Sequence, residues 1–362
     1  MLAPSAAAGA TVATAAARPV TDAALGTTRV VVYVATAVLI GGVAFLALVA
    51  GPALAATAPR SVGPRAAEAL AANARRLFLW GLAAGAIATA LGIVLQASAA
   101  LGGSFWDALR PAVIADSLST RFGATWGLRL VDLGVVAVLL LGAATGLRYR
   151  ALLPARLGAG GAGATAAGPR RPVTAVALGV ALCLLVLVPA FGGHAGVIEP
   201  RWPRTPVSFV HVLSFALWGG GLVAMLVCLP AATRELEGAD RTRLQAAAVG
   251  RFSTLALAAV AGLLVSGIAR SVLELGSWGE LTATGYGRAI LIKAGLFSGL
   301  IALGAYNRQR LLPAIRSAIG GSDGPGKAAL ALRRSVRAEV VLIGGVLAAT
   351  AVLAGLTPPA AT

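Results

Sequence analysis

The chain contains only two histidines, and both lie beside the same short segment between two apolar stretches. His194 follows one apolar stretch within the sequence GGHAG, and His211 lies near the start of the next. Imidazole is the commonest metal-binding side chain, and two neutral imidazoles can hold Cu(I) in a linear site. The pattern therefore predicts that His194 and His211 share a Cu(I) ion, with an interhelical hydrogen bond for each ring as the alternative.

Two sulfur side chains fall close to the helical faces of these histidines. Cys183 precedes His194 and lies about 20° from its face of an ideal helix, and Met225 lies nearly on the face of His211. Soft sulfur donors suit Cu(I), so Cys183 and Met225 are candidate ligands along an inward path. Hydrophobic packing is the alternative for both.

A second set of side chains could bind a cofactor rather than a metal. Arg129 and Lys293 lie within apolar stretches, where a charged group costs about 2.5–3.5 kcal/mol and therefore needs a partner. Arg129 has Asp132 one turn away, whereas Lys293 has no acidic partner on its own helix and favours an anion such as a haem propionate. Trp218 and Tyr33 complete this candidate set, and packing is the alternative for Trp218.

The elements that must position these residues are transmembrane helices. Of the 362 residues, 58% are hydrophobic and only 12% are charged. Apolar runs of about 20 residues recur along the chain, and each is long enough to cross the roughly 30 Å hydrocarbon layer. The sequence thus predicts an all-α polytopic membrane protein. Eight spans are expected, near 29–54, 77–99, 122–146, 173–193, 206–230, 252–275, 287–306 and 338–357.

The net charge of +17 indicates topology rather than nucleic-acid binding. Most lysines and arginines fall in alternate loops, after the first, third, fifth and seventh spans, and they are not clustered with aromatic residues as in nucleic-acid binders. The positive-inside rule places these four loops in the cytoplasm and both termini outside. The lipid bilayer is therefore the expected surrounding, and no nucleic-acid partner is expected.

The two halves of the chain repeat one another. Residues 31–53 align without gaps onto 209–231, with Gly41 and Gly42 matching Gly219 and Gly220. Arg129 matches Lys293 in the same way, and Tyr33 matches His211. We interpret the spans as two parallel four-helix repeats. The expected divisions are a disordered external tail at 1–28, a first repeat with the start of a linker at 29–157, a Gly/Ala-rich cytoplasmic linker at 158–172, and a second half with spans four to eight at 173–362.

Five motifs in the second half resemble one family of bacterial membrane proteins. These are GGHAG (192–196), HVLSFALWGGG (211–221), RFSTLAL (251–257), YGRAILIK (286–293) and NRQRLLP (307–313). They resemble the copper resistance D family of the bacterial inner membrane. The resemblance implies an eight-span protein of the cytoplasmic membrane that acts in copper uptake or homeostasis. It also implies a periplasmic copper-binding partner of the resistance C type, and it maps the family's histidines onto His194 and His211 and its lysine onto Lys293.

Three functions remain open at this point. The first is a copper transport or homeostasis protein that binds Cu(I) at its outer side and is not an enzyme. The second is a haem-binding membrane redox protein, with His211 as axial ligand and Lys293 and Arg129 at the propionates. The third is a scaffold without a ligand. No P-loop is present that would power transport by nucleotide hydrolysis.

Overall fold

We analysed a computed structural model of the chain, which describes residues 6–59, 61–101, 106, 109–141, 170–192, 201–317 and 326–355. Every regular element in these ranges is helical. The α-helices are α1 (Ala6–Ala44), α2 (Gly51–Thr57), α3 (Gly63–Leu101), α4 (Pro111–Ser119), α5 (Arg121–Leu141), α6 (Arg170–Gly192), α7 (Arg201–Phe215), α8 (Gly221–Arg234), α9 (Gly238–Glu274), α10 (Glu280–Ala283), α11 (Gly285–Tyr306), α12 (Leu312–Ser317) and α13 (Gly326–Gly355). Three π-helical segments, η1 (Phe45–Ala50), η7 (Ala216–Gly220) and η8 (Asn307–Leu311), continue the helices that precede them.

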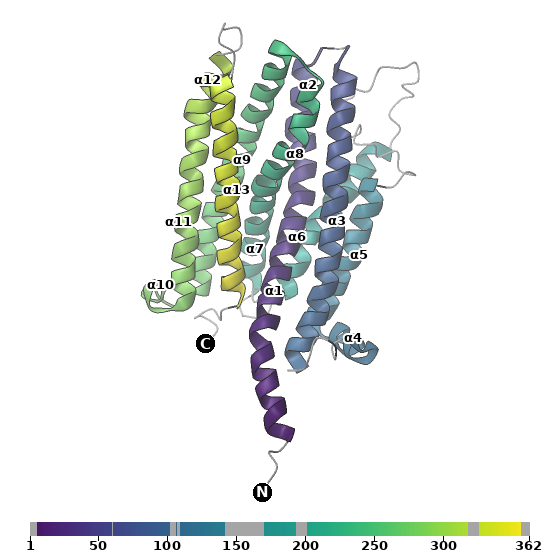
Figure 1. The fold of residues 1–362 in the computed structure, drawn as a ribbon, viewed down its shortest axis with the longest axis vertical. Coiled ribbons are helices and arrows are strands. Elements are labelled where there is room, and N and C mark those ends of the chain that lie inside the picture. Colours follow the sequence, from purple (N-terminus) through teal and green to yellow (C-terminus); the bar gives the residue numbers. More distant parts are fainter. Residues whose placement is uncertain are drawn as a thin grey trace.

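The long helices form one bundle with their axes roughly aligned (Figure 1). Helices α1, α3, α5 and α6 lie on one side of the bundle, and α9, α11 and α13 lie on the other, with α7 and α8 between them. The short helices α4 and α10 lie at one end, which we call the α4/α10 end, and α2 and α12 lie at the opposite end. In Figure 1, α1 begins and α13 ends on the side of the α4/α10 end.

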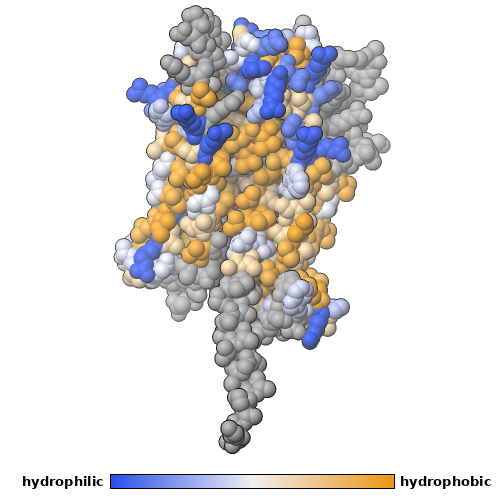
Figure 2. All heavy atoms as spheres, viewed as in Figure 1, coloured by the Kyte–Doolittle hydropathy of each residue, from blue (hydrophilic) through white to orange (hydrophobic). Residues whose placement is uncertain are grey.

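The surface of this bundle matches a membrane. Six helical stretches are long and apolar enough to cross a bilayer: Ala23–Thr57, Gly63–Ala99, Arg121–Leu140, Trp202–Arg234, Gly238–Glu274 and Gly285–Ala314. On the face shown in Figure 2, an apolar band crosses the middle of the bundle, and hydrophilic residues gather at its ends. Valines and isoleucines of the long apolar helices, such as Val138, Val265 and Ile292, are more than half exposed, as expected of lipid-facing side chains. The protein is therefore a multi-pass helical membrane protein.

Two of the eight expected spans are not among these six stretches. The stretch 173–193 lies in α6, whose described apolar part, Val173–Leu187, is shorter than a full span. The stretch 338–357 largely coincides with α13 but is not among the six. The number eight, the parallel repeat and the external termini therefore remain predictions.

The structure describes most of the expected N-terminal tail but little of the expected linker. Helix α1 begins at Ala6, so residues 6–28 are helical where the sequence favoured a disordered tail. The alanine-rich composition explains this, because alanine has the highest intrinsic helix propensity. Several helices also continue past the apolar core; α3, for example, begins at Gly63 rather than near residue 77. The expected linker at 158–172 lies outside the described residues except for its last three positions.

A close crossing between α1 and η7 holds the two sides of the bundle together. A Cβ atom on Gly220 would overlap the carbonyl oxygen of Ala37, and one on Gly41 would overlap the carbonyl oxygen of Ala216. Glycine at both positions lets the two backbones touch, as in other tightly packed transmembrane helices. Gly41 and Gly220 lie in the two segments that align between the halves of the sequence, so this crossing joins those two segments.

Candidate functional site

His211 lies on α7 and faces α9. Its Nδ1 atom lies 3.0 Å from the hydroxyl oxygen of Ser266, and this hydroxyl donates in turn to the carbonyl oxygen of Gly262 at 2.5 Å. Because the Ser266 proton is used in that bond, the serine oxygen is the acceptor and Nδ1 carries the proton. The ring packs beside Gly267, where a Cβ atom would lie 3.6 Å from its Cε1 atom in ordinary van der Waals contact. In this tautomer the Nε2 lone pair is available to a ligand.

An ion pair and a tyrosine extend this polar face of α9 toward the α4/α10 end. Ser266, Arg270 and Glu274 are spaced four residues apart, which puts them on one side of the helix. Arg270 donates to Oε1 of Glu274 from Nη2 at 2.8 Å and from Nε at 3.2 Å. The hydroxyl of Tyr286, at the start of α11, donates to Oε2 of Glu274 at 2.5 Å. The carboxylate thus joins α9 to α11.

Lys293 and Tyr33 complete the surroundings of this site from two other helices. Lys293 on α11 lies close enough to His211 and to the Arg270–Glu274 pair for its charge to act on them. Tyr33 on α1 lies within electrostatic range of both Arg270 and Arg129. His211 and Lys293 therefore belong to one site and Arg129 to a second, with Tyr33 within range of both.

The second of these sites surrounds Arg129, which is 2% exposed on α5. Its Nη1 atom donates to the carbonyl oxygen of Leu185 on α6 at 2.8 Å, and its Nη2 atom donates to the hydroxyl of Thr36 on α1. Asp132 is close enough for its charge to act on Arg129, but the described residues show no direct ion pair between them. The expected Arg129–Asp132 pair is thus replaced by contacts to two other helices, because a guanidinium has several donors to place.

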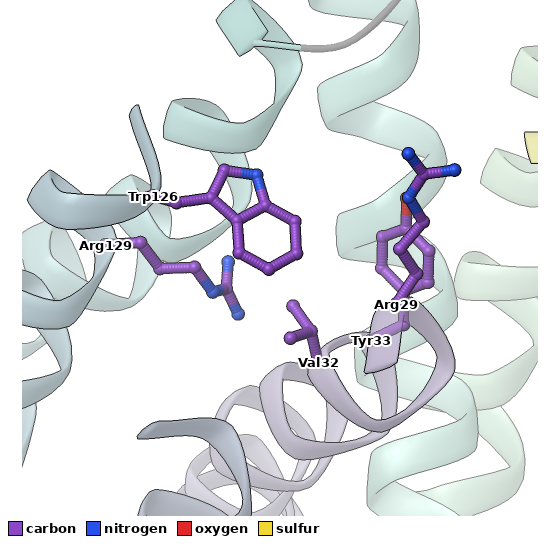
Figure 3. Close-up of a pocket in the computed structure, with 5 residues that line it drawn as sticks. All are labelled: Arg29, Val32, Tyr33, Trp126 and Arg129. Atoms are coloured by element: carbon purple, nitrogen blue, oxygen red, sulfur yellow. The ribbon is translucent and has the colours of Figure 1, made fainter. Parts of the chain in front are cut away.

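Arg129 also lines a small pocket between α1 and α5. The other lining residues are Arg29, Val32, Tyr33 and Trp126. Figure 3 shows Arg129 and Trp126 extending from α5 toward Val32 of α1, while Arg29 and Tyr33 stand side by side on α1. Trp126 is stacked on Phe122 with ring centroids 4.8 Å apart. Its indole also lies against Gly92 of α3, where a Cβ atom would overlap the ring.

The other predicted ligands lie apart from these two sites or outside the described residues. His194 falls in the range 193–200, which the structure does not describe. Met225 is buried in the apolar core, and Cys183 is exposed on α6. Trp218 is buried and meets the ring of Phe297 edge-on, with centroids 6.0 Å apart. Within the described part of the chain, no three His, Cys, Asp or Glu side chains group as a metal site.

Sequence reasoning missed four residues of the His211 site: Ser266, Arg270, Glu274 and Tyr286. A signal for two of them was present, since Arg270 and Glu274 are ionisable residues one turn apart inside the span expected at 252–275. The spacing of Ser266 to Arg270 repeats that turn. Tyr286 lies at the first turn of the next helix, and its contact with Glu274 has no local sequence signal.

Comparisons with known proteins identify the family of this membrane protein. Residues 20–168 match the family model described as copper resistance protein D-like, N-terminal domain, and residues 246–353 match the model described as copper resistance protein D. The chain belongs to the copper resistance D family. His194 and His211 lie in the stretch between the two matches.

Three known proteins are similar to parts of this chain. The copper transport protein CutJ of Bacillus subtilis is 29% identical over 66% of this chain and 40% of its own length. Copper resistance protein D of Pseudomonas syringae pv. tomato is 26% identical over 73% of this chain and 78% of its own length. The inner membrane protein YebZ of Escherichia coli is 35% identical over 30% of this chain and 35% of its own length. No solved structure matches the chain.

Proposed function

We propose that this protein binds Cu(I) at His211 near the outer face of the bacterial cytoplasmic membrane and moves it across that membrane. Membership of the copper resistance D family supports copper as the cargo, and the CutJ relative is named a copper transport protein. The chain spans 40% of that relative, so the activity is argued from this chain's own site. None of the matched proteins is named for haem, and we do not pursue that alternative.

The observation that carries the proposal is the hydrogen-bond chain from His211 through Ser266 to Gly262. Metal-binding histidines usually donate their second ring N–H to a fixed acceptor, which sets the tautomer and aims the other nitrogen at the metal. Ser266 supplies that acceptor. His194 is the proposed second ligand, because two imidazoles suffice for a linear Cu(I) site.

The positive charge of Lys293 beside His211 bears on how tightly the site binds. A neighbouring cation opposes the binding of Cu(I), and Arg270 acts on His211 in the same sense even though it is paired with Glu274. A transport site must bind its ion well enough to admit it and weakly enough to release it. We therefore propose a site of moderate affinity, with Met225 and Cys183 as candidate ligands further along the helices.

The direction of entry follows from the arrangement of charges. Tyr286 and Glu274 lie near α10, so His211 is nearer to the α4/α10 end, whereas the connection from α8 to α9 and helix α12 lie at the other end (Figure 1). Arg234, Arg241 and Arg243 belong to that other end, which the positive-inside rule assigns to the cytoplasm. Copper would then meet His211 from the periplasmic side, where a copper-binding protein of the resistance C type is the proposed partner.

Copper binding and uptake by the purified protein test this proposal. The affinity for Cu(I) is measured by competition with a chromophoric chelator under reducing conditions, and uptake is measured with radioactive copper in proteoliposomes. We expect His211→Ala and His194→Ala each to abolish both signals, and Asn73→Ala to preserve them. Asn73 is a suitable control because its side chain donates only to the Ala69 carbonyl oxygen of its own helix. Wild-type affinity and uptake in folded His211→Ala protein would refute the proposal.

A further inference from the structure

The pocket beside Arg129 has the chemistry of an anion site, and the proposed copper function does not use it. Two guanidinium groups, those of Arg29 and Arg129, line it together with the phenol ring of Tyr33. Its remaining walls are the side chains of Val32 and Trp126 (Figure 3). Two cations beside an apolar wall favour a ligand that carries a negative group on an apolar body.

The hydrogen bonds of Arg129 leave one edge of its guanidinium unused. Nη1 and Nη2 bind Leu185 and Thr36, but the buried Nε atom has no hydrogen-bond partner among the described residues. A buried donor without a partner costs about 1–3 kcal/mol, more when the group is charged. A phosphate or carboxylate can accept from Nε and an adjacent Nη together, which is the strongest geometry that arginine offers to an oxyanion.

The net charge of the surroundings favours an anion as well. Asp132 acts on Arg129 from the same helix and is 6% exposed, but it does not line the pocket. The residues that line the pocket thus include two arginines and no acidic side chain. Arg29 precedes Tyr33 by one turn of α1, and both residues line the pocket (Figure 3).

The pocket lies near the level of a membrane–water interface. Helix α5 begins at Arg121, so Trp126 and Arg129 lie about 8 and 12 Å along it at 1.5 Å per residue. Three tryptophans near the same end, Trp106, Trp202 and Trp278, are 75%, 80% and 67% exposed. Exposed tryptophans concentrate where headgroups meet hydrocarbon, so the pocket opens within reach of lipid phosphates.

We propose that Arg29, Arg129, Tyr33 and Trp126 form a binding site for an anionic oxygen group, filled by the phosphate of an anionic phospholipid. A water-soluble anion offers the same oxygen chemistry but no apolar body to lie against Val32 and Trp126. The two sources are distinguished by the ligands used in the test.

The experiment measures ligand binding to the purified full chain in a neutral detergent, by native mass spectrometry and by the shift in melting temperature. The probes are dihexanoyl phosphatidylglycerol, dihexanoyl phosphatidylcholine of the same chain length, and sodium phosphate. We expect saturable binding of phosphatidylglycerol, at least tenfold weaker binding of phosphatidylcholine, and at least a tenfold loss of phosphatidylglycerol affinity in Arg29→Gln and in Arg129→Gln. Arg121→Gln is the matched control, because Arg121 is an exposed arginine at the start of the same helix α5 and does not line the pocket.

Each outcome decides between the alternatives. Saturable binding of phosphate that competes with phosphatidylglycerol would retain the anion site and assign it to a soluble ligand. Equal binding of both lipids, or an equal loss in Arg121→Gln, would overturn the proposal, as would the absence of saturable binding by any probe. If Arg129→Gln does not fold, Arg29→Gln and Arg129→Lys decide the question, since lysine keeps the charge but removes the Nε donor.

Discussion

Replacing Gly220 by alanine places a methyl group where the backbone of α1 passes. The new Cβ atom would overlap the carbonyl oxygen of Ala37, which is part of a helix and has no side-chain freedom with which to move aside. Overpacking of this kind costs about 1–3 kcal/mol, and a backbone obstacle places the cost at the upper end. The gain in helix propensity from glycine to alanine returns about 1 kcal/mol. We therefore expect a net loss of about 1–2 kcal/mol in the free energy of unfolding.

The adjacent residue provides a matched control for this prediction. A Cβ atom on Gly219 would meet only the ring of Phe215, at 3.3 Å, and that ring can turn slightly. Gly219→Ala should therefore be neutral or slightly stabilising. Unfolding by a denaturing detergent, followed by circular dichroism, measures both variants under the same conditions. The reasoning would be refuted if Gly220→Ala proved as stable as Gly219→Ala. Gly41 and Gly220 lie at the same helix crossing, so the losses caused by Gly41→Ala and Gly220→Ala should not simply add. A double variant with twice the loss of Gly220→Ala would also contradict the reasoning.

Two further predictions concern the His211 site. Ser266→Ala removes the acceptor of the Nδ1 proton and should weaken Cu(I) binding by about 10–100-fold in the chelator competition assay. The control is Ser271→Ala, which should leave the affinity unchanged because the Ser271 hydroxyl donates to the Gly267 carbonyl of its own helix. Equal effects of the two substitutions would contradict the assigned tautomer. Glu274→Gln breaks the contacts to Arg270 and Tyr286 and should lower the free energy of unfolding by about 1–3 kcal/mol, less than for a fully buried pair because Arg270 is 34% exposed. The control is Asp240→Asn, which removes an exposed ion pair with Arg243 and should lower the free energy of unfolding by less than about 0.5 kcal/mol. A loss as large as that of Glu274→Gln would show that burial does not determine how much these ion pairs contribute to stability.

Much of the architecture was accessible from the sequence because the bilayer imposes simple constraints on it. Apolar length alone located six stretches that the structure shows as helices long and apolar enough to cross a bilayer, since a segment in lipid must be helical and about 20 residues long. The extensions of α3 and α9 beyond the apolar core were missed. They are held by helix-forming residues outside the hydrocarbon layer, which a search for apolar runs does not register.

The site was less accessible because its contacts join distant parts of the chain. The family resemblance singled out His211 and Lys293, but the acceptor for His211 is a serine on another helix. Arg129 was recognised as an ionisable group in a span, and one of its acceptors is the backbone carbonyl of Leu185, 56 residues away. Every residue carries such a carbonyl, so the sequence does not single out this partner. Such contacts depend on how helices turn toward one another, which hydropathy does not specify.

The position of Tyr33 between the two arginines gives the first helix a role in both halves of the molecule. Its ring lines the Arg129 pocket, and the residue also lies within electrostatic range of Arg270 beside His211. The same helix touches η7 directly one to two turns further on, at Ala37 and Gly41. A rotation or shift of α1 would thus alter the shape of the Arg129 pocket and the surroundings of His211 in a single movement.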